Sequence, residues 1–204
     1  MKLFYAPGAC SVGIHILLEE IGEPYEAAAI NLREGDQFRP AFRALNPKSK
    51  VPALVREDGS LLTEFPAIAF WLARSHPAAK LLADDIETQT RALEAMEYVT
   101  ATVHMQGFSR LLHPERFAPG EADVERVVAR GREIVAAGFQ AFDQALADKE
   151  YLLGAFSIAD AALFFVQFWG VRRLGMTLPS NLAAHFDRIL ARPAVGRVLQ
   201  REGL

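Results

Sequence analysis

The hydrophobic positions at the start of the chain follow two different spacings in turn. The apolar run at positions 3–5 predicts a short β-strand. Beyond it, Ile14, Leu17, Leu18 and Ile21 recur at the spacing of a helix with one buried face. We therefore expect the chain to begin with a strand, a turn and a helix.

The next sixty residues predict a mixed α/β arrangement. Residues 25–32 read as a second strand, and because a helix separates it from the first, the two strands should be parallel. Residues 33–46 suggest a loop leading into a short helix. Asp58-Gly59 lies between two short apolar runs and predicts a β-hairpin, and Pro66 suits the first turn of a following helix. The expected order for residues 1–76 is β-α-β-α-β-β-α.

After Asp85 only the helical spacing remains. It predicts a helix that is interrupted between Gly107 and Pro114, and a long helix over residues 124–146. The segment 157–160 has the S-x-x-D form of a capping box and opens a helix that is apolar on every side, so this helix should be buried. We expect an α/β domain over residues 1–78 and an all-helical domain over residues 86–204.

Composition narrows the possible environments and partners. A net charge of −3 and a pI near 6.0 give no basic surface for nucleic acid. No apolar stretch is long enough to predict a membrane span, and the N-terminus lacks the pattern of a secretion signal. The single cysteine excludes an internal disulfide and is typical of a reducing compartment. A cytoplasmic location is therefore expected.

Candidate chemistry appears where the first helix begins. Cys10 and Ser11 lie at this position, where unpaired N–H groups and the helix dipole favour a negative charge. Helix N-termini lower the pKa of cysteine, so Cys10 is a candidate thiolate. The residues equally allow a structural interpretation, in which Ser11 caps the helix and Cys10 fills space in the core.

Several stretches together resemble a known family, the cytosolic glutathione S-transferases, and most closely their bacterial beta class. The resemblance covers essentially the whole chain. It implies a thioredoxin-like domain that binds glutathione as co-substrate, a helical domain with a pocket for an electrophile, a role in detoxification, a homodimer and no metal. The matching stretches are 2–11 (KLFYAPGACS), 46–54 (NPKSKVPAL), 62–64 (LTE), 156–160 (FSIAD), 192–195 (RPAV) and 202–204 (EGL).

The resemblance also implies roles for residues of the first domain. Val51-Pro52 matches a cis peptide bond whose valine backbone pairs with the cysteinyl part of glutathione. Glu64 matches an acidic residue that holds the γ-glutamyl end, and Lys50 is placed to reach the glycine carboxylate, although a solvated surface lysine explains it as well. Phe65 stands where many relatives have Ser or Thr, so a weaker glutathione site is expected.

For the catalytic residues, the resemblance implies a second set of roles. Cys10 matches a cysteine that stabilises the glutathione thiolate or forms a mixed disulfide with it, and Ser11 is the neighbouring hydroxyl that activates the thiol in other classes. His104 matches a histidine that faces this cysteine in relatives and could act as a base or polarise the thiolate, and a partly exposed helix histidine is the alternative. Met105 follows in place of a lysine, and the segment is one residue longer than in relatives, which a π-bulge would absorb.

Four further residues are candidates for the electrophile pocket, and for Trp169 a place in the core is the alternative. They are Phe108, Leu112, His113 and Trp169.

Three functions therefore follow as hypotheses. The first is conjugation of glutathione to small hydrophobic electrophiles. The second is a glutathione-dependent thiol–disulfide oxidoreductase or dehalogenase that acts through Cys10. The third is a non-catalytic binding protein with the same fold, which Phe65 and Met105 keep open.

Overall fold

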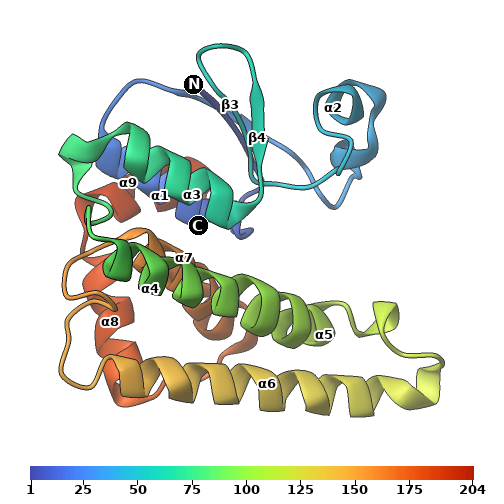
Figure 1. Ribbon diagram of the computed structural model, residues 1–204. Helices are drawn as coiled ribbons and strands as arrows, with labels where there is room; N and C mark the ends of the chain where they lie inside the picture. The colour runs from blue at the N-terminus through green and yellow to red at the C-terminus, as the bar shows by residue number, and fades with distance from the viewer. The chain divides into compact units, whose positions relative to one another are not determined.

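The computed structural model describes residues 1–204, which form two compact units (Figure 1). Unit 1 consists of Met1–Ala83 together with Ile189–Leu204, and unit 2 consists of Asp84–Arg188. The break after Ala83 lies within the predicted 78–86 interval. The C-terminal residues differ from the expected division, because they group with unit 1.

Unit 1 has the predicted β-α-β-α-β-β-α order, with one more helix from the C-terminus. Its elements are β1 (Lys2–Tyr5), α1 (Ser11–Ile21), β2 (Glu26–Ala29), a 3₁₀ turn (Asp36–Phe38), α2 (Pro40–Leu45), β3 (Ala53–Val55), β4 (Leu61–Thr63), α3 (Phe65–Ser75), a 3₁₀ turn (Pro77–Ala79) and α9 (Pro193–Glu202).

The sheet of unit 1 has the strand order β2-β1-β3-β4. β1 and β2 are parallel, with Lys2 opposite Glu26, which confirms the βαβ prediction. β3 pairs antiparallel with both β1 and β4. The turn between β3 and β4 contains Gly59 at φ 80°, a conformation that glycine adopts without a steric penalty, so the predicted hairpin is also confirmed.

Helix α9 belongs to unit 1 because it packs on α1. Its apolar residues Val195 and Val198 are fully buried. At the edge of the contact, the Arg192 guanidinium donates to both carboxylate oxygens of Glu20, at 2.7 and 3.0 Å. The Arg197 guanidinium donates to Glu19 at 2.6 Å. Apolar burial and ion pairs thus both attach the C-terminal helix to the first one.

A buried polar contact joins the end of α9 to the turn before Cys10. The two carboxylate oxygens of Glu202 contact different partners: one accepts from the backbone N–H of Gly8 at 2.8 Å, and the other lies 2.7 Å from Nδ1 of His15. Both ionisable side chains are fully buried. The C-terminal helix therefore fixes the turn that leads into α1.

Unit 2 consists of helices, as predicted. Two of its segments have π-helical hydrogen bonding: η3 (Tyr98–Phe108), which continues from α4 into α5, and η6 (Trp169–Arg173), which extends α7. None of the helices is long and apolar enough to cross a membrane. The remaining elements are α4 (Ile86–Glu97), α5 (Ser109–Leu112), two 3₁₀ turns (Pro114–Arg116 and Glu121–Asp123), α6 (Val124–Ala145), α7 (Ile158–Phe168) and α8 (Ser180–Leu190), whose last two residues lie in unit 1.

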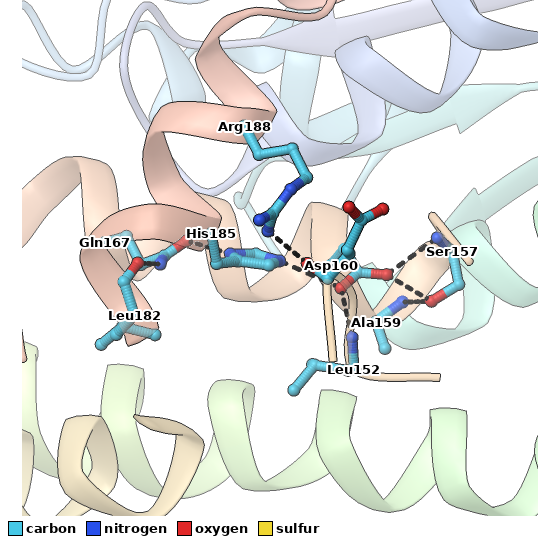
Figure 2. A network of polar contacts seen from close by, with 9 residues as sticks. Leu152, Ser157, Ala159, Asp160, Gln167, Leu182, His185 and Arg188 are labelled. Atoms are coloured by element: carbon cyan, nitrogen blue, oxygen red, sulfur yellow. Dashed lines mark hydrogen bonds and ion pairs between the residues drawn. The ribbon is translucent and has the colours of Figure 1, made fainter. Parts of the chain in front are cut away.

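The central helix α7 is buried along its whole length and begins with the predicted capping box. Figure 2 shows the network around it: Asp160 accepts from the backbone N–H and hydroxyl of Ser157, each at 2.8 Å. The same carboxylate also accepts from the Leu152 N–H at 2.9 Å and lies 3.0 Å from Nε2 of His185. The capping box therefore also anchors a loop and helix α8.

Helix α6 approaches η3 closely because glycines line the contact. A Cβ atom on Gly138 would lie 2.5 Å from Val103 Cγ2, and one on Gly107 would lie 2.7 Å from Val135 Cγ2. Real Cβ atoms do not come so close. Glycine is required at these positions by space rather than by backbone conformation.

We expect Gly138→Ala to destabilise the protein by about 1–3 kcal/mol through overpacking. Gly196→Ala is the matched control, since Gly196 also lies in a helix but has open space around it, so alanine should leave stability equal or raise it by up to about 1 kcal/mol. Urea unfolding of both variants measures the difference. Equal effects of the two substitutions would show that the α6–η3 contact is not tight.

Candidate active site

Cys10 occupies the N-cap position of α1 without a capping hydrogen bond from its side chain, and its thiol contacts the segment before β3. The thiol donates a hydrogen bond to the carbonyl oxygen of Val51 at a sulfur–oxygen distance of 3.5 Å. Cys10 is partly buried and forms no disulfide. A ligand that pairs with the Val51 backbone would therefore lie next to the Cys10 sulfur.

The electrostatic environment keeps Cys10 in the thiol form. Burial raises its pKa to about 12, and the negative charge of Glu64 acts in the same direction. The backbone N–H of Ser11 and the charge of Lys50 lower the pKa, but by less. The prediction of a lowered pKa at the helix N-terminus is wrong, because desolvation of the sulfur outweighs the N–H groups of the helix.

We expect Cys10 to react slowly with iodoacetamide at neutral pH. A pKa near 12 in place of 9.0 lowers the thiolate fraction by about a thousandfold, and the greater nucleophilicity of a more basic thiolate leaves a net decrease of about 50-fold. Alkylation followed by mass spectrometry, with the urea-unfolded chain as control, measures this ratio. Equal rates in the folded and unfolded chain would contradict the raised pKa.

The Ser11 hydroxyl has a different partner from the Cys10 thiol. Its side chain is fully buried, and its hydroxyl donates to the Ala6 carbonyl at 3.3 Å and accepts from the Ala6 N–H at 3.1 Å. Ser11 closes the loop between β1 and α1 instead of capping the helix. Both sequence interpretations of Ser11, as activating hydroxyl and as cap, therefore give way to this structural role.

The turn before Val51 is held by a buried asparagine. The Asn46 amide donates to the Lys50 carbonyl at 2.9 Å and accepts from the Lys48 N–H at 3.1 Å. Ser49 between them has φ 55°. The Val51-Pro52 peptide bond that follows is cis, as the resemblance implied. Asn46 thus shapes the turn that presents Lys50 and the Val51 backbone.

Glu64 occupies the N-cap position of α3 in a conformation that is rare for residues with a side chain, at φ 70° and ψ 126°. Such backbone strain concentrates at functional sites. Its exposed carboxylate pairs with the Lys48 ammonium at 2.7 Å, and that ammonium also donates to the Thr63 hydroxyl at 2.9 Å. Phe65, the next residue, has a buried side chain. Phe65 therefore offers only backbone atoms to a ligand at this helix start.

Unit 2 brings together most of the other candidates in an aromatic cluster. The His104 and Trp169 rings lie nearly perpendicular at a centroid distance of 4.8 Å, and Phe108 contacts Trp169 at a centroid distance of 5.6 Å. His104 and Phe108 come from η3, and Trp169 begins η6, so both π-helical segments contribute. The π-helical hydrogen bonding of η3 agrees with the prediction that the longer segment is absorbed in this way.

The remaining pocket candidates differ in exposure. Phe108 is fully buried against Phe139 and Trp169, so it supports the cluster from within and does not line a surface. Leu112, the last residue of α5, is half-buried. His113 is exposed and lies 3.3 Å from the Glu115 carboxylate. Neither residue has a ring contact with the cluster.

Sequence reasoning missed three residues that organise this site. Asn46 and Lys48 lie within a matched stretch, but no role followed from their spacing. Glu202 also lies in a matched stretch, yet its contact with Gly8 spans 194 positions and is invisible in local patterns. Nowhere in the chain do three or more His, Cys, Asp or Glu side chains form a group that could hold a metal ion.

A four-stranded mixed sheet with a cis-proline loop, followed by a helical unit, defines a thioredoxin-like protein with a helical second domain. The family model for the N-terminal domain of glutathione S-transferases matches residues 8–75, and the model for the C-terminal domain matches residues 99–193. The chain belongs to the glutathione S-transferase family.

Several individual members of this family match the chain over its full length. The chain is 35% identical to glutathione S-transferase GstA of Escherichia coli O157:H7, covering 100% of both chains. A sphingomonad glutathione S-transferase solved in complex with glutathione is 35% identical, with a TM-score of 0.85 over 100% of both chains. A beta-class enzyme from Sphingomonas chungbukensis is 34% identical, with a TM-score of 0.84 and the same coverage.

Other relatives in the family carry different names. Maleylacetoacetate isomerase of Pseudomonas aeruginosa is 30% identical, covering 87% of this chain and 84% of the relative. Disulfide-bond oxidoreductase YfcG of Escherichia coli K12 is 25% identical, covering 100% of this chain and 96% of the relative. Membership of the family therefore does not by itself define the reaction that this protein catalyses.

Proposed function

We propose that this protein is a glutathione transferase that joins the glutathione thiolate to small hydrophobic electrophiles. The observation that carries the proposal is the grouping of the Cys10 thiol with the Val51 backbone in unit 1. These two groups are 3.5 Å apart, and Glu64 and Lys50 are close enough to act on the pKa of the thiol. Together they offer a peptide edge and charges of both signs.

Each part of glutathione has a matching group in this arrangement. The Val51 backbone pairs with the cysteinyl residue as an added strand would, which gives affinity without using side chains. The Glu64 carboxylate holds the γ-glutamyl ammonium, and Lys50 attracts the glycine carboxylate. Lys48 already pairs with Glu64, so it keeps this carboxylate in place.

The reacting thiolate belongs to glutathione in this mechanism. Cys10 stays protonated because its own pKa is about 12. When glutathione binds, the single S–H of Cys10 turns from the Val51 carbonyl and donates to the glutathione sulfur. With an aryl chloride, the carbon–sulfur bond forms, the carbon–chlorine bond breaks, chloride leaves, and the thiol proton passes to solvent. We assign His104 to the polarisation of the thiolate, and the Trp169 cluster to electrophile binding.

A covalent role of Cys10 is the alternative, and the name of the YfcG relative supports it. The raised pKa argues against it, because disulfide exchange needs a thiolate. Cys10→Ser separates the two functions, because serine keeps a hydrogen-bond donor for the glutathione sulfur but cannot form a disulfide. Loss of mixed-disulfide formation with conjugation retained would assign conjugation to the non-covalent route, whereas loss of both would favour the oxidoreductase or dehalogenase.

The proposal is tested by following conjugation of glutathione to 1-chloro-2,4-dinitrobenzene in absorbance. We expect saturable, enzyme-dependent product formation. Absence of conjugation together with no retention on immobilised glutathione would instead support a non-catalytic binding protein.

We expect Glu64→Gln to weaken glutathione binding by about 10- to 100-fold, since a hydrogen bond to a charged group contributes about 1.5–3 kcal/mol. Glu57→Gln is the control, because Glu57 is an exposed glutamate of the same unit whose side chain forms no ion pair. Isothermal titration with glutathione gives both affinities. Equal affinities of the two variants would remove Glu64 from the site.

We also propose a cytoplasmic homodimer. The single cysteine supports the compartment, and the resemblance to the family supports the dimer. Light scattering coupled to size-exclusion chromatography distinguishes a dimer from a 22.5 kDa monomer.

A further inference from the structure

Lys48 is held in place at both its backbone and its ammonium group. The backbone N–H donates to Oδ1 of the buried Asn46 at 3.1 Å. The ammonium donates to the Thr63 hydroxyl at 2.9 Å and to Oε1 of Glu64 at 2.7 Å. A lysine ammonium has three N–H donors, so one of them is left for a further acceptor.

The Glu64 carboxylate keeps an unused acceptor beside this ammonium. Lys48 contacts only its Oε1 atom, and no protein group donates to Oε2. The Lys48 and Glu64 side chains are 54% and 61% exposed, so a ligand in solution can reach both of them. The pair therefore offers a donor and an acceptor of opposite charge, side by side, to the same ligand.

The start of helix α3, next to this pair, supplies few donors of its own. The Phe65 side chain has no polar atom, and Pro66 has no backbone N–H. An anionic group that lies beside Glu64 therefore needs another donor, and it also needs a cation that offsets the charge of the glutamate. The Lys48 ammonium meets both needs.

We propose that Lys48 and Glu64 together bind the zwitterion of an α-amino acid, and that Lys48 is a specificity-determining residue that binds its carboxylate. The proposal rests on the proposed transferase function, which assigns the γ-glutamyl ammonium of glutathione to Glu64. That ammonium shares its carbon atom with a carboxylate, so a neighbouring acceptor and donor can bind both groups at once. With Lys48 on Oε1 and the ligand ammonium on Oε2, the four charges alternate in sign.

This contact makes the protein select glutathione over tripeptides that lack the γ-glutamyl carboxylate. Removing the ligand carboxylate takes away the acceptor, and removing the Lys48 ammonium takes away the donor. Either change should weaken binding by about tenfold, at the lower end of the range for a hydrogen bond to a charged group. Because both changes break the same contact, the two together should weaken binding little more than one alone.

The test is isothermal titration of the full-length protein with two tripeptides. Glutathione carries the carboxylate, whereas 4-aminobutyryl-cysteinylglycine lacks it and keeps the amino group. We expect Lys48→Met to weaken glutathione binding by about tenfold, and binding of the aminobutyryl tripeptide by less than about twofold. Lys80→Met is the matched control, because Lys80 is an exposed lysine of unit 1 and its replacement changes the net charge equally. It should leave both affinities within about twofold of the wild type.

The outcomes separate the two proposals. Unchanged or tighter glutathione binding in Lys48→Met, or equal losses with both tripeptides, overturns the contact of Lys48 with the carboxylate while the glutathione site stands. An aminobutyryl tripeptide that does not bind even the wild type also overturns it, because the carboxylate would then depend on much more than one lysine. Titration measures binding alone, so a protein that binds glutathione without conjugating it loses the transferase function and still decides the role of Lys48. A wild type that does not bind glutathione overturns both.

Discussion

Replacing Asp160 by alanine is expected to destabilise unit 2 by about 3–5 kcal/mol, because the change leaves several buried groups without an acceptor. The carboxylate accepts from the Ser157 N–H, the Ser157 hydroxyl and the Leu152 N–H, and it lies 3.0 Å from the buried His185 ring (Figure 2). A capping interaction alone contributes about 1 kcal/mol. The larger value expected here comes from the links to the loop and to α8.

The two tryptophans allow the effect to be assigned to one unit. Trp71 lies in unit 1 and Trp169 in unit 2, so in a Trp71→Phe background the fluorescence reports unfolding of unit 2. Asp160→Ala should lower the midpoint of thermal unfolding by about 6–20 °C. Ser157→Ala should cost about 1 kcal/mol, and Asp148→Ala, at an exposed aspartate without a side-chain partner, should be neutral. An Asp160→Ala loss no larger than that of Ser157→Ala would contradict the wider network.

Replacing Glu202 by alanine is expected to destabilise unit 1 by about 2–5 kcal/mol, because two buried donors lose their acceptor. One is the Gly8 N–H and the other is the ring nitrogen of His15. The second ring nitrogen of His15 is buried without a partner, so the imidazole has no other polar contact to replace Glu202. Since Gly8 lies in the turn before Cys10, glutathione binding should weaken as well.

Hydrogen exchange followed by mass spectrometry reports this change locally. Peptides covering α1 and the preceding turn should lose protection in Glu202→Ala. Glu202→Gln keeps an acceptor for the Gly8 N–H and should retain most of the protection and most of the glutathione affinity. Gln200→Ala, at an exposed position of the same helix, should change neither. Unaltered exchange in Glu202→Ala would show that α9 does not hold the turn.

The elements of both units follow from local patterns in the sequence. Short apolar runs and helical spacing predicted the strands and helices of residues 1–76 in the right order, and Asp58-Gly59 predicted the β3–β4 hairpin. The capping box at Ser157 was also predictable, because its two side chains are three residues apart. Local hydrogen bonding and side-chain periodicity decide these features, and both depend on residues that are close together in the sequence.

The features that the sequence did not predict depend on burial or on contacts between residues that are far apart in the sequence. The pKa of Cys10 was predicted with the wrong sign, because the pattern shows a helix start but not the desolvation of the sulfur. Ser11 and Phe108 were candidates for contact with a ligand, yet both are fully buried. The contact of Glu202 with His15 joins the two ends of the chain, which no local pattern contains.

The account is tested most directly by a crystal structure of the protein with glutathione. It predicts the cysteinyl residue paired with the Val51 backbone, the γ-glutamyl end at Glu64, and the glutathione sulfur within hydrogen-bonding distance of the Cys10 thiol without a covalent bond. Glutathione bound away from these three residues, or joined to Cys10 through a disulfide in every subunit under reducing conditions, would contradict it.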